Sequence, residues 1–565
     1  MKNLPVGVGL VVLTSPLSQA ISRFRTLFPQ ISFYVDKLLY VHILPDSDSW
    51  PPKKANTLGE FADNADIVRW TNVASGIYGH GSSKPMLDLR LLLHGFKTSM
   101  AEDFDGLKIN HKIEAVFFDP LIETEWMKHY TAICLKQVSQ QNSSFGLQNI
   151  PLITPKESPV KCSNSSTQQE EASFVVKATD KMYENVVLGG TFDRIHAGHK
   201  ILLTTSLLRC RNRITVGITE GDNLMKKKIL RELIQPCQKR IELVTEFLQD
   251  VDPSLKEYRV IPIHDPFGPS IEDPSLNLIV GSQETEKGCQ KVNEERNTRG
   301  LSQLDIHVID IIDDKAAEKI GPEDEDKISS SSQRMRLLGL ELKPPERTWN
   351  RGQGPYIIGL TGGSCSGKTN ISKYLATLGA GVINCDLLGH AVYAPGTKGF
   401  YKVIDVFGNE LIANDGTIDR KELAKRVFGE ENQSNLRKLE AILWPEIWNM
   451  VQEEIASIRL EGQKQVVVID AAVLLKAGWK KHVHQVWVSI IDAETAIQRI
   501  MERDSKSEED ARRRLSTQIP NQKYVDEASV VFCSKWEIAY TRKQVDTAWN
   551  HLVHTYIRKN HIEFK

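Results

Sequence analysis

Short apolar runs alternate with longer amphipathic stretches over most of the 565-residue chain. Each apolar run has the length of a buried strand and ends in a turn signal, whereas the stretches between the runs have the length of helices. Strands that alternate with helices predict parallel sheets and an α/β fold. Such runs occur near the N-terminus ("GLVVLTSP"), in the middle of the chain ("RITVGITEG") and in its last third ("QVVVIDAAVLL").

Polar stretches divide this pattern into domains. Residues 138–181 are rich in Ser, Gln, Asn and Pro and have no apolar periodicity, which predicts a flexible linker. It follows an N-terminal α/β domain, residues 1–137, and precedes a second α/β domain, residues 183–342. The run "LKPPERTWNRGQGP" predicts a further junction, after which a last domain spans residues 354–565.

No catalytic pattern occurs in residues 1–137, so a regulatory or targeting role is expected for them. Their apolar run "VGVGLVVL" favours a buried strand, with membrane association or a targeting signal as the alternative. No run reaches the roughly 20 apolar residues of a membrane span. We therefore expect a cytoplasmic protein, and leave open an association with mitochondria and a peripheral membrane or protein partner of the N-terminal region.

Charge and cysteine content exclude two classes of protein. Lys and Arg number 71 against 72 Asp and Glu, so no nucleic acid is expected as a partner, and cations that bind anionic ligands must be concentrated in pockets. The eight cysteines are scattered without metal-ligand spacing. A chain of this length with scattered cysteines is not a small disulfide-stabilised module. We therefore expect the cysteines to be reduced thiols.

A first glycine turn lies in "VVLGGTFDRIHAGHK". The strand ends at Gly189 and Gly190, a helix begins near Ala197, and glycine lets the backbone approach a phosphate closely. His196 and His199 flank the helix start, where free N–H groups and the positive end of the helix dipole favour anions. The turn predicts a triphosphate site, against the alternative that glycines and histidines meet there by chance.

This turn resembles the HxGH motif of Rossmann-like nucleotidyltransferases, and its T-F-D prefix resembles phosphopantetheine adenylyltransferases. The runs "MKKKI", "IPIHDPFGP", "SQETEKGCQKVNEER" and "KISSSSQR" extend the resemblance. It implies that Thr191 and His199 contact the reacting phosphates, that His196 binds the β- and γ-phosphates, and that Lys227 bridges both reactants, with Lys226 or Lys228 as alternatives. Further substrate-binding residues that it implies are Gly190, Phe192, Asp265, Glu284, Thr285, Asn293, Arg296, Ser329, Ser330, Ser331 and Arg334.

A second glycine turn, "GGSCSGKT", has the spacing of a phosphate-binding P-loop and lies between a strand and a helix, as that motif requires. Lys368 is expected to bind the β- and γ-phosphates of ATP, and the Thr369 hydroxyl to bind Mg²⁺. Cys365 is either a small residue that fits the loop or a thiol that forms a mixed disulfide with coenzyme A, by exchange with coenzyme A disulfide, and so blocks ATP. The ATP-binding residues expected here are Gly362, Gly363, Ser364, Cys365, Ser366, Gly367, Lys368 and Thr369.

The segments after this turn resemble dephospho-coenzyme A kinases, in "GAGVINCDLLGHAVYAPG", "DGTIDRKELAKRVFG" and "RIMERDSKSEEDARRRLSTQ". The resemblance implies that Asp386 is the catalytic base for the attacking hydroxyl, with a helix cap as its alternative role. It implies that Asp470 is a further Mg²⁺ ligand, although the family's D-x-P-L-L reads "DAAVLL" here, and a strand-end cap is the alternative role. It also implies lid cations in Arg499, Arg503 and Arg514. The H-P-x-I motif of the family appears here as "WPEI", so no role is transferred to Trp444.

Together the two glycine turns resemble those of bifunctional coenzyme A synthases. The resemblance implies adenylyl transfer from ATP to 4'-phosphopantetheine, which gives dephospho-coenzyme A and pyrophosphate, followed by phosphorylation of the ribose 3'-hydroxyl. The expected substrates are ATP, 4'-phosphopantetheine and dephospho-coenzyme A, with Mg²⁺ as cofactor. Two alternatives stay open: a nicotinamide mononucleotide adenylyltransferase fused to a ribosylnicotinamide kinase, and a scaffold in which one catalytic half has decayed.

Overall fold

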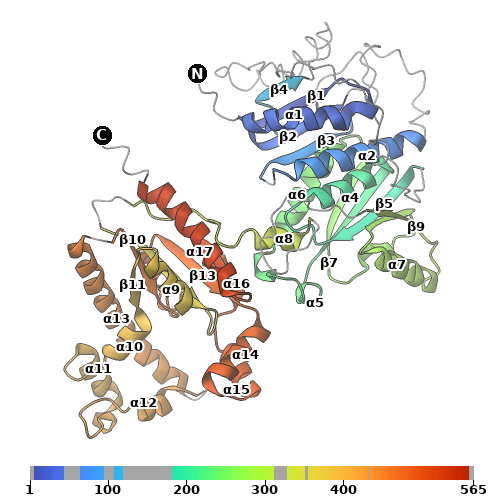
Figure 1. Ribbon diagram of the computed structural model, residues 1–565. Helices are drawn as coiled ribbons and strands as arrows, with labels where there is room; N and C mark the ends of the chain where they lie inside the picture. Colours follow the sequence, from blue (N-terminus) through green and yellow to red (C-terminus); the bar gives the residue numbers. More distant parts are fainter. Residues whose placement is uncertain are drawn as a thin grey trace. The chain divides into compact units, whose positions relative to one another are not determined.

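The computed structural model describes residues 6–43, 64–84, 86–94, 107–118, 181–310, 328–349, 354–429, 432–462 and 464–558 (Figure 1). Contacts divide the chain into two compact units. The first consists of Met1–Lys319 with Glu325–Gln333, and the second of Ile320–Asp324 with Arg334–Lys565. Residues 138–180 of the expected linker lie outside the described residues.

The N-terminal sheet of the first unit has four parallel strands in the order β3-β2-β1-β4. Helix α1 (Ala20–Tyr34) connects β1 to β2, and α2 (Asn64–Gly81) lies in the chain between β2 and β3. The apolar run that was expected to begin a buried strand is β1, whose last five residues are all buried. The strands are β1 (Val6–Leu13), β2 (Val35–Ile43), β3 (Asp88–Leu92) and β4 (Ala115–Phe118).

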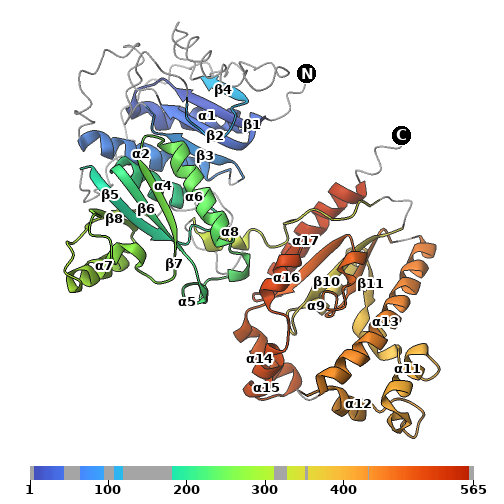
Figure 2. The same cartoon turned by 180° about the vertical axis from the view of Figure 1, so that it is seen from behind.

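The second sheet of this unit has five parallel strands in the order β7-β6-β5-β8-β9 (Figure 2). The winding reverses between β5 and β8, and ligands of open α/β sheets bind at the carboxyl ends of strands at such a point. The strands are β5 (Tyr183–Gly190), β6 (Cys210–Thr219), β7 (Glu257–Ile263), β8 (Leu278–Ser282) and β9 (Asp305–Ile309). The helices are α4 (Ala197–Leu208), α5 (Asp222–Met225), α6 (Cys237–Val251), α7 (Glu286–Thr298) and α8 (Ser330–Met335).

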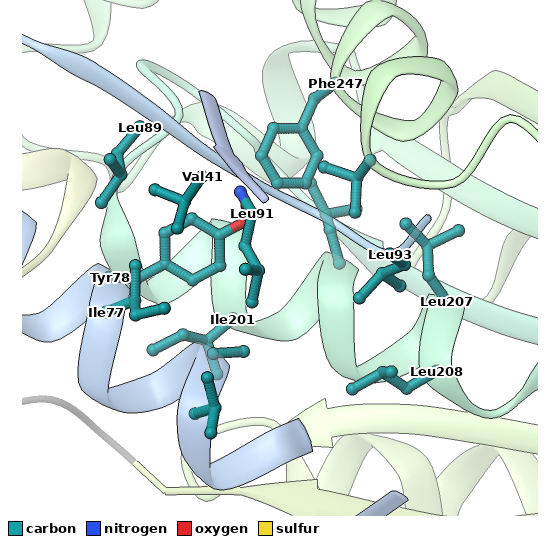
Figure 3. Close-up of a cluster of buried hydrophobic side chains, with 14 of the residues drawn as sticks. Val41, Ile77, Tyr78, Leu89, Leu91, Leu93, Ile201, Leu207, Leu208 and Phe247 are labelled. Carbon is teal, nitrogen blue, oxygen red and sulfur yellow. Dashed lines mark hydrogen bonds between the residues drawn. The ribbon is translucent and has the colours of Figure 1, made fainter. Parts of the chain in front are cut away.

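The two sheets of the first unit share one hydrophobic core. Helix α2 of the N-terminal part packs against α4, and strand β3 packs against α6. Figure 3 shows side chains of this core from both parts, among them Tyr78 of α2, Leu91 of β3, Ile201 of α4 and Phe247 of α6. The N-terminal part is therefore built into the same compact unit as the second sheet, which the run of polar residues between them did not predict.

The second unit contains a five-stranded parallel sheet in the order β11-β12-β10-β13-β14. Its strands are β10 (Tyr356–Gly362), β11 (Gly381–Asn384), β12 (Val466–Asp470), β13 (Gln485–Ile490) and β14 (Val530–Cys533). The helices are α9 (Lys368–Thr377), α10 (Cys385–Ala391), α11 (Lys398–Phe407), α12 (Arg420–Val427), α13 (Gln433–Glu461), α14 (Ala493–Asp504), α15 (Glu508–Ser516), α16 (Asn521–Glu527) and α17 (Ile538–Leu552). The expected α/β class, with two different glycine turns on parallel sheets, is confirmed.

The segment before the second unit's first strand is part of that unit. Glu341 forms an antiparallel bridge with Val530 at the β14 edge of the sheet. The Gly339 N–H donates to the Val531 carbonyl at 2.9 Å, and the carboxylate of Glu341 accepts from Tyr556 at 2.7 Å. Residues 339–342, expected at the end of the adenylyltransferase domain, thus pack on the kinase sheet.

Replacing Gly339 by alanine is expected to destabilise the second unit. Gly339 has φ +81°, and an added Cβ would lie 2.2 Å from the Gln544 carbonyl oxygen. The left-handed backbone alone costs about 1 to 2 kcal/mol for a residue with a Cβ. The midpoint of thermal unfolding should fall by about 2 to 4 °C for each kcal/mol lost in a unit of this size, as calorimetry would measure.

Gly416 offers the matched control. Its φ is +80° and nothing lies within 4 Å of an added Cβ, so Gly416→Ala carries the backbone strain without the clash. An equal loss of stability in the two variants would contradict the close approach of Gly339 to Gln544.

Among the described residues, no helix combines the length and the apolar character that a membrane span requires.

Candidate active sites

The first glycine turn lies at the carboxyl end of β5, beside the point where the winding of the second sheet reverses. His196 is the N-cap residue of α4, and the rings of His196 and His199 stack with centroids 3.9 Å apart. Phe192, which is completely buried, packs against His199 with ring centroids 5.1 Å apart. The two histidines of the motif therefore form one rigid pair at a helix start.

The electrostatic state of His199 follows from its surroundings. Burial, together with the nearby cation of Lys228, lowers its pKa to about 3. His199 is therefore a neutral imidazole at physiological pH, and its Nδ1 is buried without a hydrogen-bond partner among the described residues. Lys226, Lys227 and Lys228 are all exposed. Lys227 was expected to bridge the reactants, whereas Lys228 is the lysine whose charge lowers the pKa of His199.

A buried arginine holds the backbone of this turn in place. Arg240 of α6 is 2% exposed and donates to the carbonyl oxygens of Thr191 at 2.7 Å and of Thr219 at 2.9 Å. It fixes the end of β5 relative to β6. Sequence reasoning missed Arg240, because a single arginine in the amphipathic run "CQKRIELV" gives no signal of its burial.

The serine-rich segment also reaches the turn. The Ser330 hydroxyl donates to the Asp193 carbonyl at 3.0 Å, and Ser329 caps α8 by accepting from the Ser332 N–H at 3.1 Å. Ser331 lies in the first turn of this helix. Arg334, expected as a cation of this site, is 1% exposed and belongs to the second compact unit. Arg334 lies in the last turn of the helix that begins at Ser330, and its role as a cation of the first site stays a prediction.

Two residues expected to bind substrate hold loops together. Arg296 is completely buried and donates to the carbonyls of Ser270 at 2.6 Å, Ser302 at 2.7 Å and Asp273 at 3.0 Å. Asn293 makes a double hydrogen bond to the backbone of Leu304. These bonds hold Arg296 and Asn293 to neighbouring loops, while the Nη2 of Arg296 is buried without a hydrogen-bond partner among the described residues. Substrate binding by Arg296 and Asn293 stays a prediction.

Three more of the expected residues lie in turns. Asp265 accepts from the N–H groups of Phe267 and Gly268, both at 2.8 Å, and so shapes the turn after β7. Thr285 accepts from the Ser282 N–H at 2.9 Å, and Glu284 is exposed beside it. The latter turn follows β8, at the carboxyl edge where the first glycine turn also lies, so Glu284 and Thr285 share that edge with it.

The second glycine turn connects β10 to α9. Gly362 has φ +144°, and an added Cβ would lie 2.1 Å from the Ser489 carbonyl oxygen. Gly367 has φ +89°, and its added Cβ would lie 2.8 Å from Ser534. Cys365 adopts φ +58°, a left-handed conformation that is unusual for a residue with a side chain. The loop thus has the tight form that phosphate binding requires, and a reactive role of the Cys365 thiol stays a prediction.

The charged groups of this site lie around Lys368. Its ammonium donates to the carbonyls of Gly362 at 2.9 Å and Gly363 at 2.8 Å. Burial lowers its pKa, while Asp470 and Asp386 oppose this shift. The Lys368 ammonium therefore lies on the glycine loop, where the charges of both carboxylates act on it.

The two carboxylates differ in their environment. Asp470 is 6% exposed, burial raises its pKa, and it accepts from the Ser372 hydroxyl at 2.8 Å. Asp386 lies exposed in the first turn of α10, whose cap is Asn384. The helix-cap alternative for Asp386 is therefore wrong, because Asn384 accepts from the N–H of Asp386 at 2.9 Å.

The arginines expected in a lid divide into two kinds. Arg499 of α14 donates to the carbonyls of Cys365 at 3.2 Å and Ser534 at 2.6 Å. Arg499 is thus bonded to the backbone of the P-loop, and its role as a lid cation stays a prediction. Arg503 and Arg514 both pair with Asp504, at 2.8 and 2.6 Å, where α14 gives way to α15.

A glutamine that the sequence reasoning passed over also holds the P-loop. Gln518, just after α15, accepts from the Ser364 N–H at 2.8 Å and donates to the Ser364 hydroxyl at 2.9 Å.

Trp444 lies in α13, and the Lys476 ammonium lies over its ring, 5.7 Å from the ring centroid. The aromatic residue in the "WPEI" run is therefore paired with a cation of the segment that follows β12.

These two sites define the class of the chain: a P-loop kinase fold that follows a nucleotidyltransferase-like fold. The family profile for dephospho-CoA kinase matches residues 356–539, and that for cytidylyltransferase-like proteins matches residues 187–336. The "Dephospho-CoA kinase" of Geobacter sulfurreducens is 36% identical over 193 residues, which are 34% of this chain and 96% of that protein. That of Symbiobacterium thermophilum is 35% identical over 34% of this chain and 80% of that protein.

Through this part, the chain belongs to the dephospho-CoA kinase family. A solved dephospho-CoA kinase from Campylobacter jejuni is 23% identical, with a TM-score of 0.28 over 35% of this chain and 96% of that one. The dephospho-CoA kinase and cytidylyltransferase-like domains together fit the last two steps of coenzyme A biosynthesis. The matched families support neither the nicotinamide alternative nor the decayed scaffold.

Proposed function

We propose that the first site transfers an adenylyl group from ATP to 4'-phosphopantetheine and that the second phosphorylates the dephospho-coenzyme A so formed. The observation that carries the proposal is the pairing of an HxGH turn with a dephospho-CoA kinase domain on one chain. A kinase of this family requires dephospho-coenzyme A, and adenylyl transfer to phosphopantetheine produces that compound. A tether between the two sites keeps the intermediate at raised effective concentration.

In the first reaction, an oxygen of the phosphopantetheine phosphate attacks the α-phosphorus of ATP, and the bond to the β-phosphate breaks to release pyrophosphate. Both reactants are anions, so the protein supplies orientation and positive potential rather than a nucleophile. The neutral His199 is suited to donate a hydrogen bond to the α-phosphate without titrating. Lys228 is the cation that we assign next to it, since its charge acts on His199.

In the second reaction, the ribose 3'-oxygen attacks the γ-phosphorus of ATP, its proton passes to Asp386, and ADP leaves. Lys368 compensates the charge of the phosphates. The Thr369 hydroxyl and the Asp470 carboxylate are hard oxygen donors of the kind that Mg²⁺ prefers, and Asp470 lies beside Lys368. When bound there, Mg²⁺ would neutralise charge on the β- and γ-phosphates. Arg503 and Arg514, now paired with Asp504, can turn to the phosphates when the lid closes.

The proposal is tested with purified protein and magnesium ATP. Pyrophosphate release should require 4'-phosphopantetheine and should not occur with nicotinamide mononucleotide. Separately, dephospho-coenzyme A should give ADP and coenzyme A. Pyrophosphate released with nicotinamide mononucleotide alone would refute the first assignment, and absence of ADP with dephospho-coenzyme A would refute the second.

A further inference from the structure

Helix α4, whose first turn holds His196 and His199, is covered from two sides. One side packs against its own sheet, and the other packs against α2 of the N-terminal part (Figure 3). Its buried residues include the polar Lys200 and Thr204 as well as aliphatic residues such as Ile201. Buried polar groups need partners. The partners of Lys200 and Thr204 are in the N-terminal part of the unit.

Lys200 follows His199 directly in the chain and is 7% exposed. Its ammonium donates to the carboxylate of Asp88, the first residue of β3, at 2.5 Å. A buried ammonium without a counter-charge is strongly unfavourable. The position of Lys200, and with it the first turn of α4, therefore depends on a residue of the N-terminal sheet.

Asp88 is itself held in place by Arg90. The Arg90 guanidinium donates to the other oxygen of Asp88 at 2.9 Å and pairs with Glu246 of α6 at 2.8 Å and with Asp250. Burial raises the pKa of the Asp88 carboxyl, but Lys200 and Arg90 outweigh it and keep that pKa below its usual value. Asp88 is thus ionised at neutral pH, and β3 is joined to both α4 and α6 by paired charges.

Two further hydrogen bonds to α2 fix the rest of α4. The Tyr78 hydroxyl of α2 lies 3.3 Å from the Thr204 hydroxyl. Arg209, at the C-terminal end of α4, donates to the Thr71 hydroxyl of α2 at 3.1 Å. The helix is therefore attached to the N-terminal part near its start, in its middle and at its end.

The N-terminal sheet itself lacks the groups of the first glycine turn. Its order β3-β2-β1-β4 repeats the winding β7-β6-β5-β8 of the second sheet. The turn after β1, however, reads "TSPLSQ", with neither glycine nor histidine. A close approach of the backbone to phosphates is therefore not provided there. The N-terminal sheet therefore supports α4 and does not provide a second phosphate site of this kind.

We propose that the N-terminal sheet is a working part of the adenylyltransferase, and that Asp88 and Lys200 are positioning residues for the histidine pair. The inference rests on the proposed adenylyl transfer. A displacement of about 1 Å at a catalytic group can cost on the order of 10²-fold in rate. Loss of the charge pair should therefore lower kcat for pyrophosphate release while the second site of the same chain continues to work.

The test compares Lys200→Met, Lys200→Arg and Asp88→Asn with the unmodified full chain, below the temperature at which each begins to unfold. We expect kcat for pyrophosphate release to fall by about 10- to 100-fold in Lys200→Met and Asp88→Asn, with the KM for ATP nearly unchanged. Lys200→Arg, which keeps the charge, should recover most of the rate. Kinase activity with dephospho-coenzyme A should not change. Asp36→Asn, which removes an exposed carboxylate of β2, is the matched control and should behave like the unmodified chain.

The outcomes separate the two proposals. No pyrophosphate from the unmodified chain would refute adenylyl transfer itself. Normal kcat in folded Lys200→Met and Asp88→Asn, with an active unmodified chain, would overturn the positioning role. Should both charge variants fail to fold, Tyr78→Phe decides, because it removes only a hydroxyl, which lies beside Thr204 and accepts from the Leu91 N–H of β3 at 3.0 Å. A several-fold fall in its kcat for pyrophosphate release would support the inference, and an unchanged kcat would overturn it.

Discussion

Kinase turnover should fall by about 10²- to 10³-fold when Lys368 is replaced by methionine, the range seen when one preorganised group that stabilises transition-state charge is removed. Methionine preserves the length and apolar stem of lysine and removes only the ammonium. In the structure that ammonium is buried and bonds to the carbonyls of Gly362 and Gly363. When ATP is bound, the same group compensates the charge of the phosphates.

The measurement is ADP formation from ATP and dephospho-coenzyme A, with pyrophosphate release from the first site as internal reference. Starting from 4'-phosphopantetheine, Lys368→Met should accumulate dephospho-coenzyme A. Lys373→Met is the matched control, since Lys373 is an exposed lysine of the same helix α9. Full kinase turnover in Lys368→Met would show that the P-loop is not where the transferred phosphate binds.

Replacing His199 by asparagine should lower pyrophosphate release by about 10²- to 10³-fold, the effect of losing one donor that is aimed at developing charge. His199 stacks on His196 and packs against Phe192, so its ring is held in one orientation. The asparagine side chain is shorter and cannot keep this stack. Kinase activity of the same variant should be normal, which makes His199→Asn and Lys368→Met reciprocal controls.

The pH profile tests the charge state of His199. Burial, together with Lys228, lowers its pKa to about 3, so the imidazole is neutral throughout the physiological range. The rate of adenylyl transfer should therefore show no step that His199→Asn removes between about pH 5 and pH 8. If the imidazolium were the active form, the rate would fall as pH rises through about 6.5, the ordinary histidine pKa.

The sequence predicts those features that depend on local pattern. The alternation of strand-length and helix-length runs predicted the parallel sheets. Both glycine turns lie between a strand and a helix, as their motifs require. Lys368, Asp386 and Asp470 act on one another electrostatically, since the starts of α9 and α10 and the last residue of β12 lie at the carboxyl edge of one parallel sheet. Sequence pattern and spacing are therefore sufficient to predict a site whose residues lie at the ends of neighbouring strands.

Long-range partners were not predictable in this way. Arg296 and Arg499 occur in sequence patterns that are typical of cations that bind ligands. In the structure, however, both donate hydrogen bonds to backbone carbonyls of loops that are distant in the sequence. Arg240 and Gln518, which support the two glycine turns, have no motif around them. Lys200 was missed for the same reason, because its partner Asp88 lies 112 residues away in the sequence.

The bridge between Glu341 and Val530 has a consequence for any shortened form of this chain. Strand β14 is the last strand of its sheet, and residues 339–342 bond to its outer side. A fragment that starts at residue 354 would leave those backbone groups open to pairing with another molecule, and bare strand edges of this kind promote aggregation. Expression of the kinase alone should therefore begin upstream of residue 339.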